Sequence, residues 1–446
     1  MNEVLQQFAL LDMLIENWDG IRVRMGSLAP ALEDQFAQLA RQLSAAQEPG
    51  QIAILIDKLL DLTEETGAYP YVRELIARAA LPSIETTRGT IGVVAAESFA
   101  VPYLTVLQLP TGGGFSPVPI FFATNRKVLP EAALENRYIG EYTKDLSYGR
   151  AKVTIPVRHR VGKVEQPSRF TRESEERHII FREPATLNNT EFATQLGQEI
   201  QYVKRKELLI FLHGYKVTFE QAARRAAQIA TDIQFGGIVI LFSWPSAGAA
   251  FSYSADEDCA AKSAEPLTNF LRDLEGGPWT GVHLVAHSMG NRVMISGLAS
   301  RVGLTLPLHN IVLVAADVDI DLFEQQFPHV SELVRQERGD LITSYATNSD
   351  RALLLSGLLH SSNRLGRFRD EPYAREGLET IDATAVDSSL LGHSYFGDER
   401  SVLTDLGLLV RESLPASRRG LMACEGLPAS KPGSTNLSRK WWVFPR

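Results

Sequence analysis

Residues 282–291, with the sequence VHLVAHSMGN, decide the expected fold. The apolar run at the start is typical of a buried strand, which breaks at Ser288 and is followed at once by a helix-compatible segment. A serine at such a sharp strand-to-helix turn exposes its hydroxyl above the sheet, and the small residues Ala286 and Gly290 allow the close approach that the turn needs. The pattern predicts that Ser288 is a nucleophile. The alternative is a serine that only caps the following helix.

Strands and helices alternate from Val118 onward, which favours an α/β fold with a mostly parallel central sheet covered by helices. The best-supported helix follows Thr218, which forms a capping box with Gln221. Further helices are expected at Asp256–Leu274 and Arg351–Leu359. Strands are expected at residues 120–123, 151–155, 208–212, 238–242, 282–286, 311–315 and 342–346, with a weaker one at 380–383.

A serine nucleophile on this kind of turn takes its acid and then its histidine from later in the chain. Of the nine histidines, His360 and His393 lie far enough beyond Ser288, past the strands that follow it. We expect His360 at a helix end and His393, in a loop after the last strand, as the general base. Asp350, just past the strand at 342–346, is the expected acid, and Asp317, after the preceding strand, is the alternative.

Two backbone N–H groups are expected to stabilise the oxyanion of a serine hydrolase. One belongs to Met289, the residue after the nucleophile. The other is expected from Tyr215, in the sequence His213-Gly214-Tyr215 that follows the strand at 208–212.

Residues 118–414 resemble a bacterial α/β-hydrolase family of unknown function, whose members are often labelled esterase or lipase superfamily enzymes. Seven short stretches carry the resemblance in one order. They are Phe122-Ala123-Thr124-Asn125-Arg126, Ser147-Tyr148-Gly149, Val153-Thr154-Ile155-Pro156, His213-Gly214-Tyr215, Phe242-Ser243-Trp244-Pro245-Ser246, Ala286-His287-Ser288-Met289-Gly290-Asn291-Arg292 and Gly392-His393-Ser394-Tyr395. The resemblance implies an α/β-hydrolase fold with a serine nucleophile.

Two aromatic residues, Trp244 and Tyr253, are candidates for binding the substrate. Aromatic side chains also pack loops, so the sequence leaves open whether these two contact a ligand. Asn125, Arg126 and His159 are expected to be structural.

Composition narrows the function further. The formal net charge of −8 gives no reason to expect nucleic acid as a partner. The two cysteines, Cys259 and Cys424, form no C-x-x-C pair, so neither a metal site nor a disulfide framework is expected. No segment reaches the ~18 apolar residues of a membrane helix. The first residues lack the basic stretch of a secretory signal, which predicts a cytoplasmic protein.

Four segments are expected along the chain. Residues 1–85 carry apolar residues at helical spacing and an excess of acidic ones, which predicts a small helical bundle, either a plain packed surface or a module that binds a protein partner. Residues 86–117 form a β-prone connector with a glycine-rich linker, and residues 118–414 the catalytic domain. Residues 415–446, rich in proline, serine and glycine, are expected to be a disordered tail.

The expected reaction is hydrolysis of a small-molecule or lipid ester through an acyl-enzyme, with Ser288, His393 and Asp350 as the triad and no cofactor. The same triad also suits an amidase, a thioesterase or a phospholipase. A third alternative is a non-catalytic scaffold of this fold whose acidic bundle binds a partner.

Overall fold

The computed structural model describes residues 114–133, 136–167, 172–247, 253–300, 303–334, 341–360, 362–386, 395–426 and 440–445. From Pro117 onward these residues form one compact unit. The bundle expected at residues 1–85 and the connector expected before the catalytic domain lie outside them, apart from the last residues of the connector.

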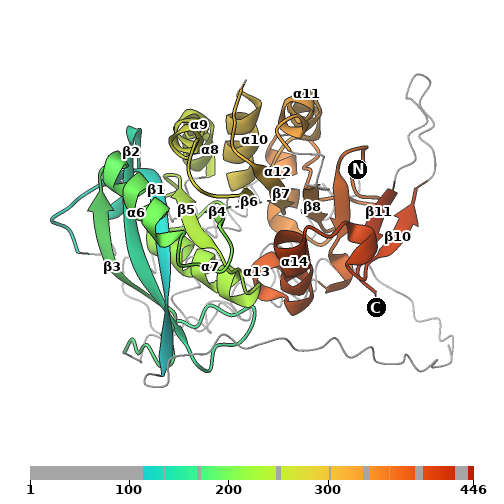
Figure 1. The fold of residues 1–446 in the computed structure, drawn as a ribbon. Coiled ribbons are helices and arrows are strands. Elements are labelled where there is room, and N and C mark those ends of the chain that lie inside the picture. The colour runs from blue at the N-terminus through green and yellow to red at the C-terminus, as the bar shows by residue number, and fades with distance from the viewer. Residues whose placement is uncertain are drawn as a thin grey trace, which may run out of the picture. The chain divides into compact units, whose positions relative to one another are not determined.

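A single large sheet runs through this unit (Figure 1). The strands pair in the order β10-β11-β9-β8-β7-β6-β4-β5-β1-β2-β3. In the part of the sheet that runs from β11 through β9, β8, β7, β6, β4 and β5 to β1, all neighbouring strands are parallel. The pairs β2–β3 and β10–β11 are antiparallel. The expected mostly parallel sheet is thus confirmed. The strands are β1 (Phe115–Val128), β2 (Tyr138–Pro156), β3 (Ile180–Leu187), β4 (Glu207–Leu212), β5 (Ile238–Ser243), β6 (Gly281–His287), β7 (Leu308–Val314), β8 (Leu341–Ala346), β9 (Glu379–Asp382), β10 (Met422–Glu425) and β11 (Lys440–Val443).

Helices cover both faces of the sheet (Figure 1). One face carries α6 (Asn189–Glu199), α8 (Tyr253–Lys262), α9 (Ala264–Asp273), α10 (Gly290–Ala299) and α11 (Ile320–Ser331), and the other carries α7 (Phe219–Asp232) and α14 (Arg400–Glu412). The short helices α12 (Arg351–Leu359) and α13 (Tyr395–Asp398) and the 3-10 turns Thr384–Val386 and Ala416–Arg418 complete the described part.

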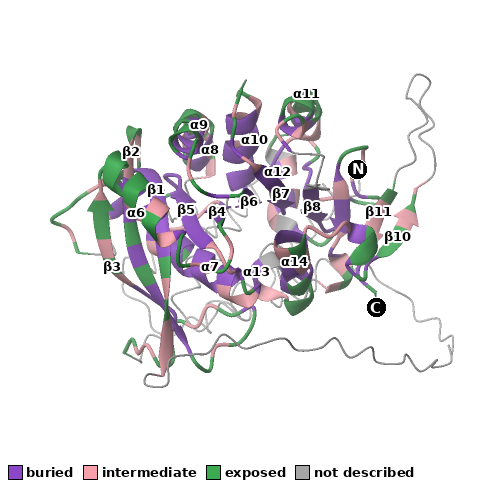
Figure 2. Cartoon of the chain, viewed as in Figure 1, coloured by how far each residue is buried: buried purple, intermediate pink, exposed green. Residues whose placement is uncertain are grey.

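The core lies in two layers, one against each face of the sheet (Figure 2). Side chains of a strand alternate between faces. In β4, Leu208, Ile210 and Leu212 therefore enter the layer beneath α9 and α10, and Leu209 and Phe211 enter the layer beneath α7. Burial on both faces explains why the central strands read as continuous apolar runs in the sequence.

Helix α7 begins as expected. The Thr218 hydroxyl accepts a hydrogen bond from the Gln221 N–H, and the Gln221 side chain accepts one from the Thr218 N–H. This capping box satisfies two amide groups that the first helical turn leaves without intrahelical partners.

The order of the central strands creates a crevice. The chain runs from β4 through α7 to its neighbour β5, and then crosses back over β4 to β6 on the other side. The helices that follow β4 and β6 lie on opposite faces, so the segments leaving these two strands diverge. Such a switch point at the carboxyl ends of parallel strands is the usual ligand site of an open α/β sheet.

The carboxyl-terminal segment differs from the expected disordered tail. Within the described residues 415–426 and 440–445, β11 pairs in parallel with β9, and β10 pairs with β11, so the sheet extends beyond the boundary expected at residue 414. Arg419 is buried against Asp405 and Glu379, and Phe444 is buried in the core. These contacts with residues distant in the sequence order the segment, although its polar composition predicted disorder.

None of the described helices combines the length and the apolar character that crossing a bilayer requires.

Candidate functional site

Ser288 occupies the sharp turn between β6 and α10. Its backbone is left-handed, with φ of 52°, a conformation that costs a residue with a Cβ about 1–3 kcal/mol. Hydrogen bonds hold it there. The Ser288 N–H donates to the Val314 carbonyl over 2.9 Å, and the Ser288 carbonyl accepts from the side-chain amide of Asn291 over 2.9 Å. This is the strained strand–turn–helix geometry that the sequence predicted around Ser288.

Two glycines let the surrounding backbone close on this turn. A Cβ on Gly290 would lie 2.4 Å from the His213 carbonyl oxygen, so only glycine allows α10 to start so near the loop after β4. A Cβ on Gly214 would lie 2.9 Å from the Ser288 Cβ. The loop that carries Tyr215 therefore packs directly on the turn that carries Ser288.

Met289, one of the two expected oxyanion donors, is the N-cap residue of α10. Its backbone N–H belongs to the amino end of that helix, where unpaired N–H groups and the helix dipole favour negative charge. Tyr215 follows Gly214 in the adjoining loop. The two residues expected to supply the oxyanion hole thus lie on two segments that touch at Ser288.

Trp244 is fully buried. Its indole N–H donates to the His213 carbonyl over 2.8 Å, and its ring stacks on the His213 imidazole with centroids 5.1 Å apart. The sequence left open whether Trp244 packs a loop or contacts a substrate. Its burial against His213 favours the packing role.

Tyr253, the other aromatic candidate, begins α8 and lies edge-on to Tyr215, with ring centroids 5.3 Å apart. Its phenol donates to the Asp317 carboxylate over 2.7 Å. It is half-buried beside the Tyr215 loop, so its expected role in binding substrate stays a prediction.

A pocket of about 270 Å³ adjoins the turn. Gly214, Tyr215 and His287 form one part of its wall, and side chains from β4, the loop after it, α7 and the segment before β3 form the rest. The remaining lining residues are Val164, Gln166, Phe211, His213, Val217, Gln221, Ala222 and Arg225. The pocket is small and mixes apolar with polar lining, which fits a compact ligand.

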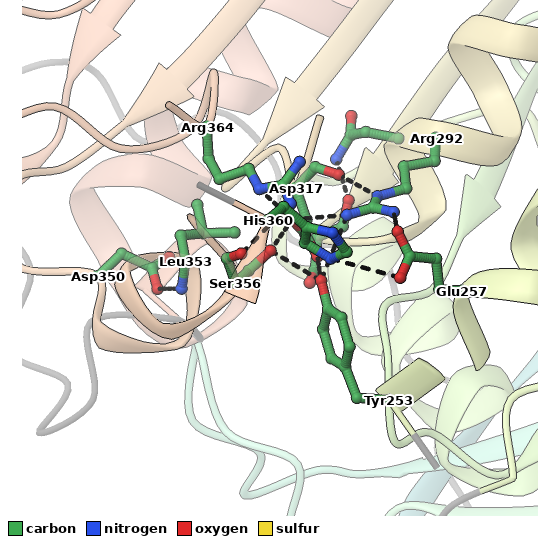
Figure 3. Close-up of polar contacts among 11 residues, drawn as sticks. Tyr253, Glu257, Arg292, Asp317, Asp350, Leu353, Ser356, His360 and Arg364 are labelled. Carbon is green, nitrogen blue, oxygen red and sulfur yellow. Dashed lines mark hydrogen bonds and ion pairs between the residues drawn. The ribbon is translucent and has the colours of Figure 1, made fainter. Parts of the chain in front are cut away.

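The two candidate acids have very different surroundings (Figure 3). The buried Asp317 carboxylate accepts from Tyr253 and from the Ser356 hydroxyl, and lies 3.3 Å from guanidinium nitrogens of both Arg292 and Arg364. Burial alone would raise the pKa of Asp317, but the two arginines and these hydrogen bonds outweigh it and lower the pKa. Asp317 is the centre of an ionic cluster.

Asp350 lies apart from this cluster, just beyond β8 (Figure 3). It is fully buried, and one carboxylate oxygen accepts from the Leu353 N–H over 2.9 Å at the start of α12. This contact places the Asp350 carboxylate at the amino end of α12, whereas the Asp317 carboxylate lies between two guanidinium groups.

His393, the expected base, lies outside the described residues. The described chain resumes with α13, where the Gly397 carbonyl accepts from Arg225 and Gln228 of α7, and Asp398 pairs with Arg225. These contacts hold α13, which follows His393 in the sequence, against α7, whose Arg225 also lines the pocket. His360, which the sequence placed at a helix end, follows α12 directly and pairs with Glu257.

Sequence reasoning missed the arginines around Asp317. Arg292 is on α10, while Arg364 comes from the loop after α12, and nothing in their local sequence marks a shared partner. The sequence also predicted only a structural role for Arg126, whose guanidinium donates to the Val217 carbonyl in the Tyr215 loop.

A trio of possible metal ligands, Glu207, His283 and His309, lies at the amino ends of β4, β6 and β7, the end of the sheet opposite to Ser288. Both carboxylate oxygens of Glu207 accept hydrogen bonds from Arg205, and His283 lies 3.4 Å from the same carboxylate. Glu207 is thus paired with Arg205 and contacts the His283 imidazole, whose pKa burial lowers.

The comparison with known families agrees with this geometry. The family described as alpha/beta hydrolase of unknown function (DUF900) matches residues 188–411, half of the chain. The chain belongs to this α/β-hydrolase family. The match runs from α6 to α14 and so includes the Ser288 turn, the Tyr215 loop and both candidate acids. Membership indicates a hydrolase. No curated protein matches the chain.

Substitution of Gly290 tests the close packing at the turn. We expect Gly290→Ala to lower the free energy of unfolding by about 1–3 kcal/mol, because the new Cβ would overlap the His213 carbonyl. Gly197→Ala is the control, since a Cβ there meets nothing within 4 Å and removes chain entropy from the unfolded state. Urea unfolding monitored by circular dichroism measures both. Equal stability of the two variants would contradict the packing described here.

Substitution of Asp317 tests its ionic role. Asp317→Asn leaves the buried Arg364 without its carboxylate and takes from Arg292 one of its two, and we expect a loss of about 3–5 kcal/mol at neutral pH. Because the pKa of Asp317 is lower in the folded than in the unfolded protein, its contribution is complete above the unfolded value of about 3.9 and disappears as the pH falls through the folded value.

The stability difference between wild type and Asp317→Asn should therefore narrow below a pH of about 4. Asp319→Asn is the control, because Asp319 is more exposed and asparagine can also cap α11. Unfolding curves from pH 3 to pH 7 test this. A difference that persists unchanged in acid would show that the stability of the site does not depend on the charge of Asp317.

Proposed function

We propose that the protein is a serine hydrolase that cleaves a carboxylic ester through an acyl-enzyme, with Ser288 as nucleophile. The observation that carries the proposal is the left-handed Ser288 turn, with the Gly214 loop packed on it. A fold tolerates backbone strain only where surrounding contacts enforce it, and such strain is concentrated at functional sites. The position of the turn, at the carboxyl ends of β4 and β6, is where an open α/β sheet binds ligands.

In the proposed reaction, His393 removes the hydroxyl proton of Ser288 while the oxygen attacks the ester carbonyl. The carbonyl oxygen becomes an anion, which accepts hydrogen bonds from the backbone N–H groups of Tyr215 and Met289. His393 then passes its proton to the departing alcohol, leaving an acyl group on Ser288. Water, deprotonated by His393, attacks that acyl group, and the acid is released as Ser288 regains its proton.

The surroundings of the two aspartates support Asp350 as the acid that orients His393. The Asp317 carboxylate already accepts two hydroxyl groups and pairs with Arg292 and Arg364. A carboxylate so engaged is poorly placed to accept a further bond from an imidazolium. Asp350 is the remaining candidate, and it lies just beyond β8, at the end of the sheet where Ser288 also lies.

The pocket beside Tyr215 supports a compact substrate. At about 270 Å³ it lies just under the range of about 300–1,000 Å³ typical of drug-sized ligands. Its apolar lining, from Val164, Phe211, Val217 and Ala222, suits an acyl or alkyl group. We therefore favour short-chain esters over long-chain lipids, and rates on amides and thioesters of the same acyl group distinguish the other bond types that the triad could cleave.

Covalent labelling tests the nucleophile. A fluorophosphonate probe, which reacts with activated serines, is expected to label the wild-type protein at one site and to leave Ser288→Ala unlabelled. Ser300→Ala, at the exposed end of α10, should be labelled like the wild type. An unlabelled wild-type protein that also hydrolyses no ester would favour the non-catalytic scaffold.

Steady-state kinetics test the acid. We expect Asp350→Asn to lower kcat about 10⁴-fold, because an asparagine cannot hold the imidazole in the required tautomer. Asp317→Asn should lose stability but keep its kcat in the folded fraction. The opposite pattern, with kcat lost only in Asp317→Asn, would make Asp317 the triad acid.

A further inference from the structure

A buried guanidinium lies beneath the loop that carries Tyr215. Arg126, near the end of β1, is 1 % exposed. Its Nε donates to the Ser243 hydroxyl over 2.8 Å and its Nη1 to the Ser246 carbonyl over 2.7 Å, both in the segment leaving β5. Its Nη2 donates to the Val217 carbonyl over 2.8 Å. Burying this charge is costly unless its donors are satisfied, and here acceptors after β4, at the end of β5 and after β5 satisfy them.

Arg126 also contributes to the protonation state of His213. The His213 Nδ1 lies 2.8 Å from the Gly214 carbonyl oxygen, which can only accept, so Nδ1 carries the proton. Its Nε2 must then accept, and it faces the Ser243 hydroxyl at 3.0 Å and the Arg126 Nη2 at 3.3 Å. Burial, and next the charge of Arg126, lower the pKa of His213 to about 3. The imidazole is therefore neutral at physiological pH.

The hydrogen bond from His213 fixes one particular peptide group. The carbonyl of Gly214 and the N–H of Tyr215 belong to the same planar peptide unit, so their directions are coupled. Holding the carbonyl with the imidazole holds the N–H that would meet the oxyanion. At the far side of Tyr215, the Val217 carbonyl is held by Arg126 and the Val217 N–H donates to the Ser246 hydroxyl over 3.1 Å. The loop is thus fixed on both sides of Tyr215.

We propose that Arg126 is a positioning residue for the oxyanion hole, which holds the Tyr215 loop through the Val217 carbonyl and through the His213 imidazole. This role rests on the proposed serine hydrolase. Lysine cannot replace arginine here, because the guanidinium directs several N–H groups in a fixed planar fork to separate acceptors, whereas an ammonium is a compact donor on a flexible stem.

The test is a kinetic comparison of Arg126→Lys with the wild type on a short p-nitrophenyl ester. Misplacement of the Tyr215 N–H weakens an interaction made mainly in the transition state, so we expect kcat to fall about 10- to 100-fold with little change in KM. The Ki of a trifluoromethyl ketone, to whose carbonyl Ser288 adds to give an oxyanion, should rise by a similar factor. If Arg126 only stabilised the fold, the Ki of the ketone would not rise while the KM of the ester stays unchanged.

Two further variants complete the design. Arg419→Lys changes another buried arginine, paired with Asp405 and Glu379, and should lower the melting temperature while kcat is kept. Ser243→Ala removes only the hydroxyl that links Arg126 to His213, and it should lower kcat in the same direction by a smaller factor. It also provides the test if Arg126→Lys does not fold.

Unchanged kcat in a folded Arg126→Lys, or in Ser243→Ala if Arg126→Lys does not fold, would overturn the role of Arg126 and leave the proposed esterase intact. A rise in KM at constant kcat would overturn it as well. Absence of Ser288-dependent hydrolysis in the wild type would instead overturn the proposed function, and the role of Arg126 with it.

Discussion

The left-handed backbone of Ser288 is the constraint on which the rest of the site depends. A residue with a Cβ pays about 1–3 kcal/mol for this conformation, and the turn persists because its neighbours leave no alternative. Val314 and Asn291 hold its backbone, and α10 starts directly against the loop after β4 because Gly290 has no side chain. The packed sheet thus stabilises a turn that would be unfavourable in isolation.

Two kinds of buried polar group surround this turn and differ in what they do. Asp317 and Glu257 neutralise Arg292 and Arg364, and the cluster joins α10 to α8 and to the loop after α12. Arg126 has no paired carboxylate among the ion pairs of the described residues, and it hydrogen-bonds instead to carbonyl and hydroxyl oxygens of two loops. Burial lowers the pKa of Arg126 to about 9, which still leaves it charged at neutral pH. Its guanidinium holds the backbone carbonyls of Val217 and Ser246 in place.

Much of this architecture could be predicted from the sequence, because the information is local. The central strands are apolar on both faces, and the capping box at Thr218 marks the start of α7. β3 was missed because only its first two residues are buried, while the others are half-buried or exposed at the sheet edge, and because it contains Pro184. The strands after residue 415 were missed because composition predicts disorder without regard to where Phe444 and Arg419 pack.

The site was predictable only in part, because only some of its features are encoded by a local sequence pattern. The Ser288 turn and the Tyr215 loop each carry a local pattern. The choice between Asp317 and Asp350 depends on arginines that approach from distant segments, and the role of Arg126 depends on contacts with loops after β4 and β5. Such long-range contacts leave no periodicity to read in one sequence.

The most direct test of Ser288 as the nucleophile, and of Tyr215 and Met289 as the oxyanion hole, is a crystal structure of the protein after reaction with a small alkyl fluorophosphonate. We predict a covalent bond between phosphorus and Ser288 Oγ, with the phosphoryl oxygen about 2.7–3.1 Å from the backbone nitrogens of both Tyr215 and Met289. The His393 imidazole should lie beside Ser288 Oγ and bond to Asp350. An adduct on another residue, or a phosphoryl oxygen directed away from those two nitrogens, would contradict the account.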